Sequence, residues 1–409
     1  MNSSGQKQLR LLYLTAEQWP TFRPDVLALF GKYLPRKGIN SDLVTEKDIE
    51  AALGMDLSWQ GGQAILCDVP RSRVGQYLVR FWHSLRVLVT VDLKKYDAIQ
   101  VRDMSLTALA GLVVARVRGI QFFYWLSYPQ SEGQVGRARS RGIKGGLRFW
   151  FPLVQGMLGK WVLYRIVLPR ADHVFVQSCQ MQKEIANHGI PMSKITPVPM
   201  GVDTEVAIPE CIQPTDDRRL EGRRVVVYLG TLDPLRQIDV LLHMLVHVRD
   251  IVPEILLVLV GDTTDDQHRK WLKQEAVRLG VSDLVYWTGW LEATVAWQYV
   301  RSAEVGLSPI PRGYLLDMGS PTKAVEYMAL GLPVLVNDNP DQVQVVAESG
   351  AGLCVRLEPS IFAEALARLL NDDDLRRVMS DAGRRYVNRS RSYDILASDL
   401  AAKYHSLLS

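Results

Sequence analysis

The stretch SPTKAVEYMALGLPVLV, residues 320–336, predicts a helix, the end of that helix and a buried strand. Ser320 is a favoured N-cap residue, and Pro321 suits the first helical turn. Gly331 ends the helical pattern, and the apolar run after it is typical of a strand that is buried on both faces. We therefore expect a helix over 321–330 followed by a strand of a parallel sheet over 333–336.

The same alternation of strand and helix extends to both sides of this stretch. Further apolar runs predict strands at 9–15, 41–45, 96–101, 120–126, 171–177, 224–229, 255–260, 284–287, 304–308 and 352–355. Helical patterns separate most of these runs, and residues 361–408 are almost entirely helical in pattern. Strands that alternate with helices imply right-handed crossovers and parallel sheets.

A polar stretch at 204–224, which contains Pro209 and Pro214, interrupts the alternation and is typical of a linker. We therefore predict an α/β protein with two parallel-sheet domains of similar size, at 1–205 and 206–390. Open parallel sheets bind ligands at the carboxyl ends of their strands. Two such domains that face each other would form a cleft suited to a reaction of two substrates.

Composition and charge exclude several classes of protein. With 47% hydrophobic residues the chain can form a full core, and its four scattered cysteines exclude a disulfide scaffold and a zinc site. No apolar run reaches the roughly 18 residues of a membrane-spanning helix, so we expect a soluble or peripheral protein. The net charge of +4 divides into +10 over residues 1–205 and −6 over 206–409, which indicates different partners for the two halves.

Two strand–helix junctions of the second half carry residues suited to phosphate. The helix after Ser320 offers free backbone amides and Lys323, and Glu326 one turn later could accept hydrogen bonds from a ribose. In the stretch 228–236, Gly230 would allow a ligand close to the backbone, and Arg236 could neutralise a diphosphate. An ordinary capped helix with a surface Lys–Glu pair is the alternative for the first junction.

In combination, several motifs resemble the retaining GT-B glycosyltransferases of family 4, the glycosyltransferases group 1. These motifs are Ala-Asp-x-Val-x-Val-x-Ser at 171–178, Gly-Ile-Pro at 189–191, Pro-Met-Gly-Val-Asp at 199–203, Gly-Thr-Leu at 230–232 and Pro-Thr-Lys-x-x-Glu-Tyr-Met-Ala-x-Gly-x-Pro-Val at 321–334. The resemblance is specific over about 171–370 and weaker over the N-terminal half. It implies two Rossmann-like domains, with a C-terminal helix at 391–409 that crosses back to the first domain.

The resemblance also implies an activity and its residues. Members transfer a sugar from a nucleoside diphosphate sugar to an acceptor, with retention of configuration and without a metal or other cofactor. Glu326 resembles the glutamate that holds the donor ribose, while Arg236 and Lys323 look like the contacts to the leaving diphosphate. Gly230 and Thr231 would line the phosphate loop.

The segment before the main motif helix would meet the donor sugar and phosphate through the amides of Gly319, Ser320 and Thr322. The family's first glutamate falls on Met318, and Asp317 lies one residue away. Ser127 and Tyr128 follow the 120–126 strand, where many members carry a histidine.

Residues 133–171 contain no Asp or Glu. Eight basic residues (Arg137, Arg139, Arg141, Lys144, Arg148, Lys160, Arg165 and Arg170) flank a run rich in aromatic side chains that includes Phe149, Trp150, Phe151, Trp161 and Tyr164. Basic residues around an aromatic helix predict an interfacial helix on anionic lipid. A core helix with solvated basic ends is the alternative, and no nucleic-acid-binding module is recognisable.

The sequence thus predicts a hexosyltransferase at the cytoplasmic face of the cell membrane. The first domain would bind a lipid-linked or glycan acceptor and the second domain the nucleotide sugar, in polysaccharide or glycolipid biosynthesis. Two alternatives are a nucleotide-sugar epimerase on the same fold and a non-catalytic subunit that binds a partner transferase.

Overall fold

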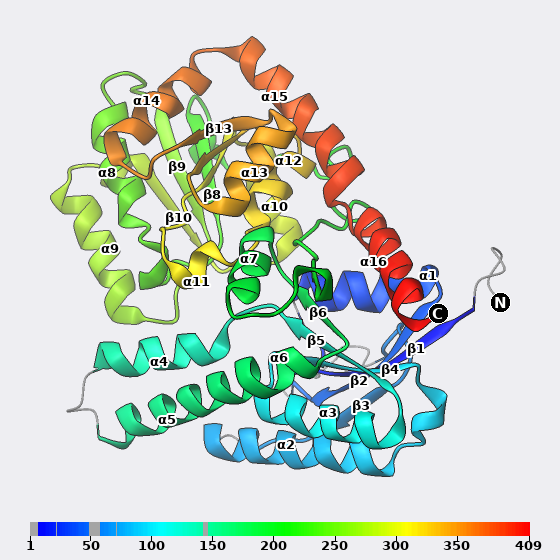
Figure 1. Cartoon of the computed structure of the whole chain (residues 1–409). Coiled ribbons are helices and arrows are strands. Elements are labelled where there is room, and N and C mark those ends of the chain that lie inside the picture. Colours follow the sequence, from blue (N-terminus) through cyan, green and yellow to red (C-terminus); the bar gives the residue numbers. More distant parts are fainter. Residues whose placement is uncertain (1–6, 22, 49–57, 71, 142–145) are drawn as a thin grey trace. The chain divides into compact units, whose positions relative to one another are not determined.

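The computed structural model describes residues 7–21, 23–48, 58–70, 72–141 and 146–409. The chain forms two compact units. The first contains the residues up to Met200 together with Tyr393–Ser409, and the second contains Gly201–Ser392. Both are α/β units with an all-parallel sheet, as the alternation of patterns predicts (Figure 1).

The first unit contains a seven-stranded sheet with the order β3-β2-β1-β4-β5-β6-β7. Its strands are β1 (Leu9–Leu14), β2 (Ile39–Glu46), β3 (Ala64–Cys67), β4 (Ala98–Arg102), β5 (Gln121–Leu126), β6 (His173–Val176) and β7 (Ile195–Pro197). Its helices are η1 (Asp25–Tyr33), α1 (Leu34–Arg36), α2 (Arg73–Thr90), η2 (Leu93–Lys95), α3 (Ser105–Arg118), α4 (Gln130–Arg141), α5 (Leu147–Val162), η4 (Leu163–Val167), α6 (Leu168–Arg170), α7 (Cys179–Asn187), η5 (Met192–Lys194) and α16 (Tyr393–Leu408).

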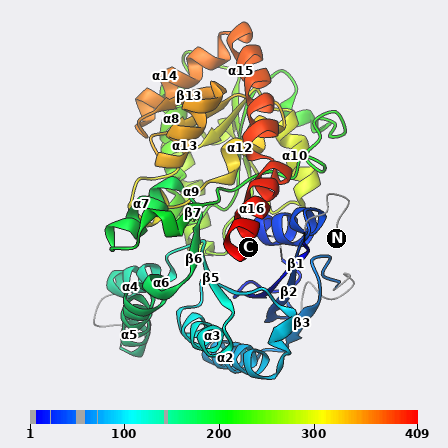
Figure 2. The same cartoon turned by 45° about the vertical axis from the view of Figure 1, so that its right-hand side comes forward.

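The C-terminal helix α16 belongs to the core of the first unit. Its residues Tyr393, Leu400 and Tyr404 are buried in one cluster with side chains of η1, β1 and β5. Figure 2 shows η1 and α16 on one face of this sheet and α2 and α3 on the other. Because both faces are covered, the strands are buried along nearly their whole length, and β5 is apolar from Phe122 to Leu126.

The second unit contains a six-stranded sheet with the order β10-β9-β8-β11-β12-β13. Its strands are β8 (Arg224–Leu229), β9 (Ile255–Val260), β10 (Val285–Gly289), β11 (Val305–Ser308), β12 (Val334–Asn337) and β13 (Gly352–Val355). Its helices are η6 (Arg218–Leu220), η7 (Pro234–Arg236), α8 (Asp239–Val248), α9 (Asp266–Arg278), η8 (Ser282–Leu284), α10 (Ala293–Arg301), α11 (Tyr314–Asp317), α12 (Thr322–Ala329), α13 (Pro340–Ser349), α14 (Pro359–Leu370), α15 (Asp373–Tyr386) and η9 (Val387–Arg391).

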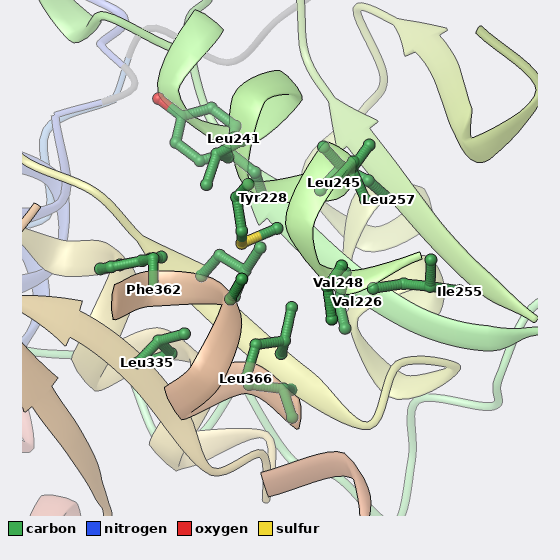
Figure 3. Packing of buried hydrophobic residues seen from close by; sticks show 14 of the residues in the cluster. Val226, Tyr228, Leu241, Leu245, Val248, Ile255, Leu257, Leu335, Phe362 and Leu366 are labelled. Atoms are coloured by element: carbon green, nitrogen blue, oxygen red, sulfur yellow. The ribbon is translucent and has the colours of Figure 1, made fainter. Parts of the chain in front are cut away.

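Two hydrophobic clusters lie on opposite faces of the second sheet. Val226 and Tyr228 of β8 point into the cluster formed with α8 and α14, which Figure 3 shows from close by. Val225 and Val227, the alternate residues of the same strand, point into the cluster that contains α10 and α12. The carboxyl ends of these strands, together with α12, contain the residues that the sequence predicts to bind phosphate.

The structure differs from the expected elements at a few places. The short strands β3 and β7 are additional to those expected. The helix expected from residue 235 begins at Asp239, because Pro234–Arg236 form a separate 3-10 turn. The helical tail consists of three α-helices separated at residues 371–372 and by η9.

Candidate active site

Glycines end three neighbouring strands of the second sheet. Gly230 follows β8, Gly261 follows β9 and Gly289 ends β10, with φ angles of +143°, +132° and +73°. A Cβ atom on Gly261 would lie 2.2 Å from the carbonyl oxygen of Gly230. A Cβ atom on Gly230 would lie 2.6 Å from Cε of Lys323. Only glycine fits these backbone positions, and a ligand can approach the peptide groups closely here.

Tyr327 fixes α12 against this edge of the sheet. Its hydroxyl accepts a hydrogen bond of 2.7 Å from the Leu229 amide at the end of β8 and donates one of 3.4 Å to the Leu307 carbonyl in β11. Gly306 makes room for the ring, since a Cβ atom there would lie 2.4 Å from it. The first turn of α12 is thereby held beside Gly230.

Lys323 and Arg236 form a cationic pair of side chains at this edge. Lys323 Nζ lies 5.3 Å from the centre of the Tyr228 ring. Burial, and then the charge of Arg236, lower the pKa of Lys323 to about 7, against the opposing effect of Glu326. Among the residues that the structure describes, neither cationic side chain forms a hydrogen bond or an ion pair. A bound anion would favour the charged form of Lys323 and would interact with both basic groups.

Glu326 lies one turn after Lys323 on α12 and is partly buried. Burial raises the pKa of its carboxyl group, and the charge of Lys323 works in the opposite direction. Within the described part of the chain the Glu326 carboxylate accepts no hydrogen bond. It is therefore available to accept hydrogen bonds from a ligand hydroxyl.

The loop after β8 is held in place by hydrogen bonds within itself and to the residues after β9. The Tyr228 hydroxyl donates to the Thr231 carbonyl at 3.0 Å, and the Leu232 amide donates to the Asp262 carbonyl at 2.9 Å. Arg236 lies at the end of the turn η7 and not in α8, and Gln237 after it has a φ angle of +48°. The two junctions expected from the sequence thus lie together, since Lys323 contacts Tyr228 and the charge of Arg236 lowers the pKa of Lys323.

The segment before α12 differs in detail from what the sequence predicts. Ser320 does not cap the helix, whose N-cap is Pro321 without a side-chain hydrogen bond. The buried hydroxyl of Ser320 instead donates to Asp341 at 2.9 Å and accepts from Arg391 at 3.3 Å. The Ser320 hydroxyl therefore belongs to a buried polar network and not to the cap of α12.

The remaining predicted residues have different surroundings. Both carboxylate oxygens of Asp317 contact the Arg312 guanidinium, at 2.9 and 3.1 Å. Met318 is fully buried. A Cβ atom on Gly319 would meet only the Leu316 carbonyl, at 3.5 Å, so the backbone is open there. Thr322 is the first residue of α12 and is partly exposed.

Sequence reasoning missed four residues that support the site. These are Tyr228 and Tyr327, which position Lys323 and α12, and Gly261 and Gly289, which open the strand ends. Gly261 directly follows the apolar run 255–260 and Gly289 lies two residues after the run 284–287, so both glycines could have been identified from the sequence. The tyrosine contacts depend on helix packing and have no comparable signal.

The basic aromatic segment 133–171 forms most of α4 together with α5, η4 and α6. Lys144 lies outside the described residues. Phe149 and Tyr164 are buried, whereas Trp150, Phe151, Val154, Met157, Leu158 and Trp161 of α5 are exposed. The neighbouring surface adds Val74, Leu78, Trp82 and Val89, which are exposed on α2. In the described part of the chain, none of the helices combines the length and apolarity that a bilayer span requires.

Comparison with known proteins identifies relatives of both units. The family model "Glycosyl transferase 4-like domain" matches residues 25–201, and the model "Glycosyl transferases group 1" matches residues 213–386. The GDP-mannose-dependent alpha-(1-6)-phosphatidylinositol monomannoside mannosyltransferase of Mycobacterium tuberculosis is 30% identical over 236 residues. That match covers 56% of this chain and 60% of the relative, less than two thirds of its length.

Two solved structures show the same fold. Sucrose-phosphate synthase from Thermosynechococcus elongatus superposes with a TM-score of 0.72 at 16% identity, over 98% of this chain and 99% of that one. HepE from Anabaena, solved in complex with UDP, gives 0.68 at 15% identity, over 97% and 100%. Because the two family models together match most of the chain, it belongs to the glycosyltransferases group 1 family, also called family 4.

Proposed function

We propose that the protein is a retaining, metal-independent hexosyltransferase that uses a nucleoside diphosphate sugar. The observation that carries this proposal is the position of Lys323, in the first turn of α12, beside Gly230 and the Tyr228 ring at the end of β8, where the charge of Arg236 also acts on it. The backbone amides of that turn, and those near the glycines that end β8, β9 and β10, add hydrogen-bond donors for a diphosphate. Glu326 supplies the acceptor that a ribose diol requires. Retention of configuration rests on membership of the family.

The proposed reaction follows from the charge that develops on the leaving group. The bond between the anomeric carbon and the diphosphate oxygen breaks, and its electron pair goes to the diphosphate. The acceptor hydroxyl forms the new bond to that carbon and gives its proton to the leaving diphosphate. Lys323, Arg236 and the helix amides stabilise the developing charge without reorganisation, so the step needs no metal.

The proposed acceptor is a lipid-linked glycan or glycolipid at the cytoplasmic face of the cell membrane. The exposed apolar side chains of α2 and α5, combined with the basic character of the first half, support it. The name of the mycobacterial relative, a phosphatidylinositol monomannoside mannosyltransferase, supports the same class of acceptor. Residues 1–205 would bind this acceptor, 206–390 the donor, and 391–409 would complete the first domain.

The test is nucleotide binding and transfer by two variants, Glu326→Ala and Arg236→Ala. We expect a panel of nucleoside diphosphates to raise the melting temperature of the wild type, since a ligand that binds only the folded state stabilises it. Each variant should lose transfer by roughly 100-fold or more, because Arg236→Ala removes a cation that stabilises the developing charge and Glu326→Ala removes the group that holds the donor ribose. Glu364→Ala and Arg368→Ala, at exposed positions of α14, are the matched controls.

Near-normal turnover of both folded variants would show that this site is not the active site. A non-catalytic subunit is supported by Met318, which is buried at the position of the family's first glutamate. That alternative predicts nucleotide binding without turnover until a second protein is added. An epimerase would instead convert the nucleotide sugar alone into an isomer.

A further inference from the structure

The first unit contains a pocket of about 130 Å³ that lies outside the predicted donor site. Its walls come from α2, the β4–α3 junction, α4 and α5. The polar side chains on these walls include Arg80, Asp103, Ser105, Gln130, Gln134 and Gln155. The pocket thus lies at the carboxyl end of β4, the edge where parallel sheets bind ligands.

The chemistry of the pocket suits an uncharged ligand with many hydroxyl groups. Three primary amides and the Ser105 hydroxyl can each donate and accept hydrogen bonds. The two charged groups already have partners, because Arg80 contacts Glu46 at 3.3 Å and Asp103 contacts Arg102 at 3.5 Å. A phosphate or carboxylate would therefore meet no uncompensated cation here, whereas hydroxyl groups find partners on several walls.

Asp103 is held in an unusual backbone conformation at the base of this pocket. Its φ angle is +56°, which residues other than glycine rarely adopt. Its carboxylate accepts a hydrogen bond of 2.8 Å from the Ser127 amide and another from the Ser127 hydroxyl. Backbone strain of this kind gathers at ligand sites, where the surrounding structure enforces it.

Size and surroundings restrict the ligand further. Binding clefts for drug-sized molecules measure roughly 300–1,000 Å³, so this pocket has room for a single small ring. Leu158 belongs to its wall and is 49% exposed, in line with the exposed Phe151 and Val154 of α5. On α2, the exposed Leu78 and Trp82 flank the pocket residues Tyr77 and Phe81. The pocket therefore opens beside apolar surface.

We propose that this pocket binds the uncharged polyol ring of the acceptor's headgroup, with the lipid part lying along the apolar side chains of α2 and α5. That the ligand is the acceptor of the reaction rests on the proposed function. Gln134 and Gln155 hydrogen-bond the ring hydroxyls. A free polyol has the same ring hydroxyls but no apolar tail, so an experiment can distinguish a free polyol from the headgroup of a lipid.

The experiment measures binding of small probes to the full-length chain by ligand-observed NMR. The probes are myo-inositol, methyl and octyl glycosides of glucose and mannose, and octyl phosphocholine as a tail with a different head. We expect the octyl glycosides to bind more tightly than the methyl glycosides and than octyl phosphocholine. The double variant Gln134→Ala/Gln155→Ala should bind the glycosides at least about tenfold more weakly, since ring hydroxyls lose their partners.

Gln76→Ala, on α2 but outside the pocket, is the matched control and should bind like the wild type. Unchanged affinity of the double variant, or no polyol binding by the wild type, overturns the pocket assignment. Equal affinity for methyl and octyl glycosides overturns the statement that the lipid lies along α2 and α5. Binding of nucleoside diphosphates by the same samples is measured in parallel, so that failure of the proposed donor site is recognised separately.

Discussion

At the scale of single residues, the charge of Lys323 depends strongly on its surroundings. Burial and Arg236 lower its pKa to about 7, so it is only partly protonated near neutral pH. A bound diphosphate favours the protonated form and raises this pKa, which means that binding above pH 7 takes up a proton. The affinity for a nucleoside diphosphate should therefore fall as the pH rises above 7.

We expect this fall to approach about tenfold per pH unit between roughly pH 7 and pH 9, because one proton is linked to binding. Calorimetric titration with UDP or GDP in buffers of different ionisation enthalpy measures both the affinity and the proton uptake. Lys323→Met should bind more weakly and lose most of the pH dependence. A wild-type affinity that stays constant over this range would contradict the assignment of Lys323 to the diphosphate.

The residues of the candidate site divide by how far local sequence determines them. Lys323 and Glu326 could be named because their spacing on one helix after a proline follows from the sequence alone. Tyr327 could not, because its hydroxyl contacts β8 and β11, which depends on how α12 packs. Ser320 was assigned to the wrong partner for the same reason, since Asp341 and Arg391 are distant in sequence.

Among the elements, the strands that sequence reasoning missed are short ones at the edges of the first sheet. β3 and β7 are the edge strands of the first sheet, with three to four residues each, and β7 ends in Pro197. An edge strand is paired on one side only and tolerates proline and polar residues. Central strands such as β8 and β9, which are covered on both faces, have the continuous apolar run that reveals them.

The helix α16 lies at the end of the chain but stabilises the first unit. Tyr404 is fully buried, packs on Phe123 and Phe175 at ring distances of 5.8 and 5.1 Å, and donates a hydrogen bond of 2.5 Å to Gln100. We predict that Tyr404→Ala lowers the free energy of unfolding by about 3–5 kcal/mol through the cavity it leaves. Tyr404→Phe should cost about 1 kcal/mol, the value of one hydrogen bond.

Urea unfolding followed by circular dichroism measures both losses. Lys403→Ala on the same helix is the control, since it removes a partly exposed side chain. If Tyr404→Ala unfolds at the same urea concentration as this control, α16 contributes little to the stability of the first unit.

At the scale of the whole molecule, charge and exposed apolar surface are distributed unevenly. The first half carries +10 and the second −6, and the exposed aromatic side chains of α2 and α5 belong to the positive half. An anionic lipid surface would attract that half and repel the other, so the protein would bind with its first half towards the membrane. Such binding would be electrostatic at first and would become hydrophobic once the aromatic side chains insert.

We therefore predict that the protein binds vesicles of phosphatidylglycerol and phosphatidylcholine but not vesicles of phosphatidylcholine alone. Trp161→Ser should weaken this binding roughly tenfold or more, because burial of a large apolar side chain contributes about 1.5–3 kcal/mol. Trp290→Ser is the matched control, since Trp161 and Trp290 are both 57% exposed but Trp290 lies in the negative half. Co-sedimentation at low and high salt measures the binding, which should weaken as salt screens the charges. Equal losses from the two variants, or equal binding to both kinds of vesicle, would contradict a membrane surface formed by α5 and favour its exposed side chains as a contact for another protein.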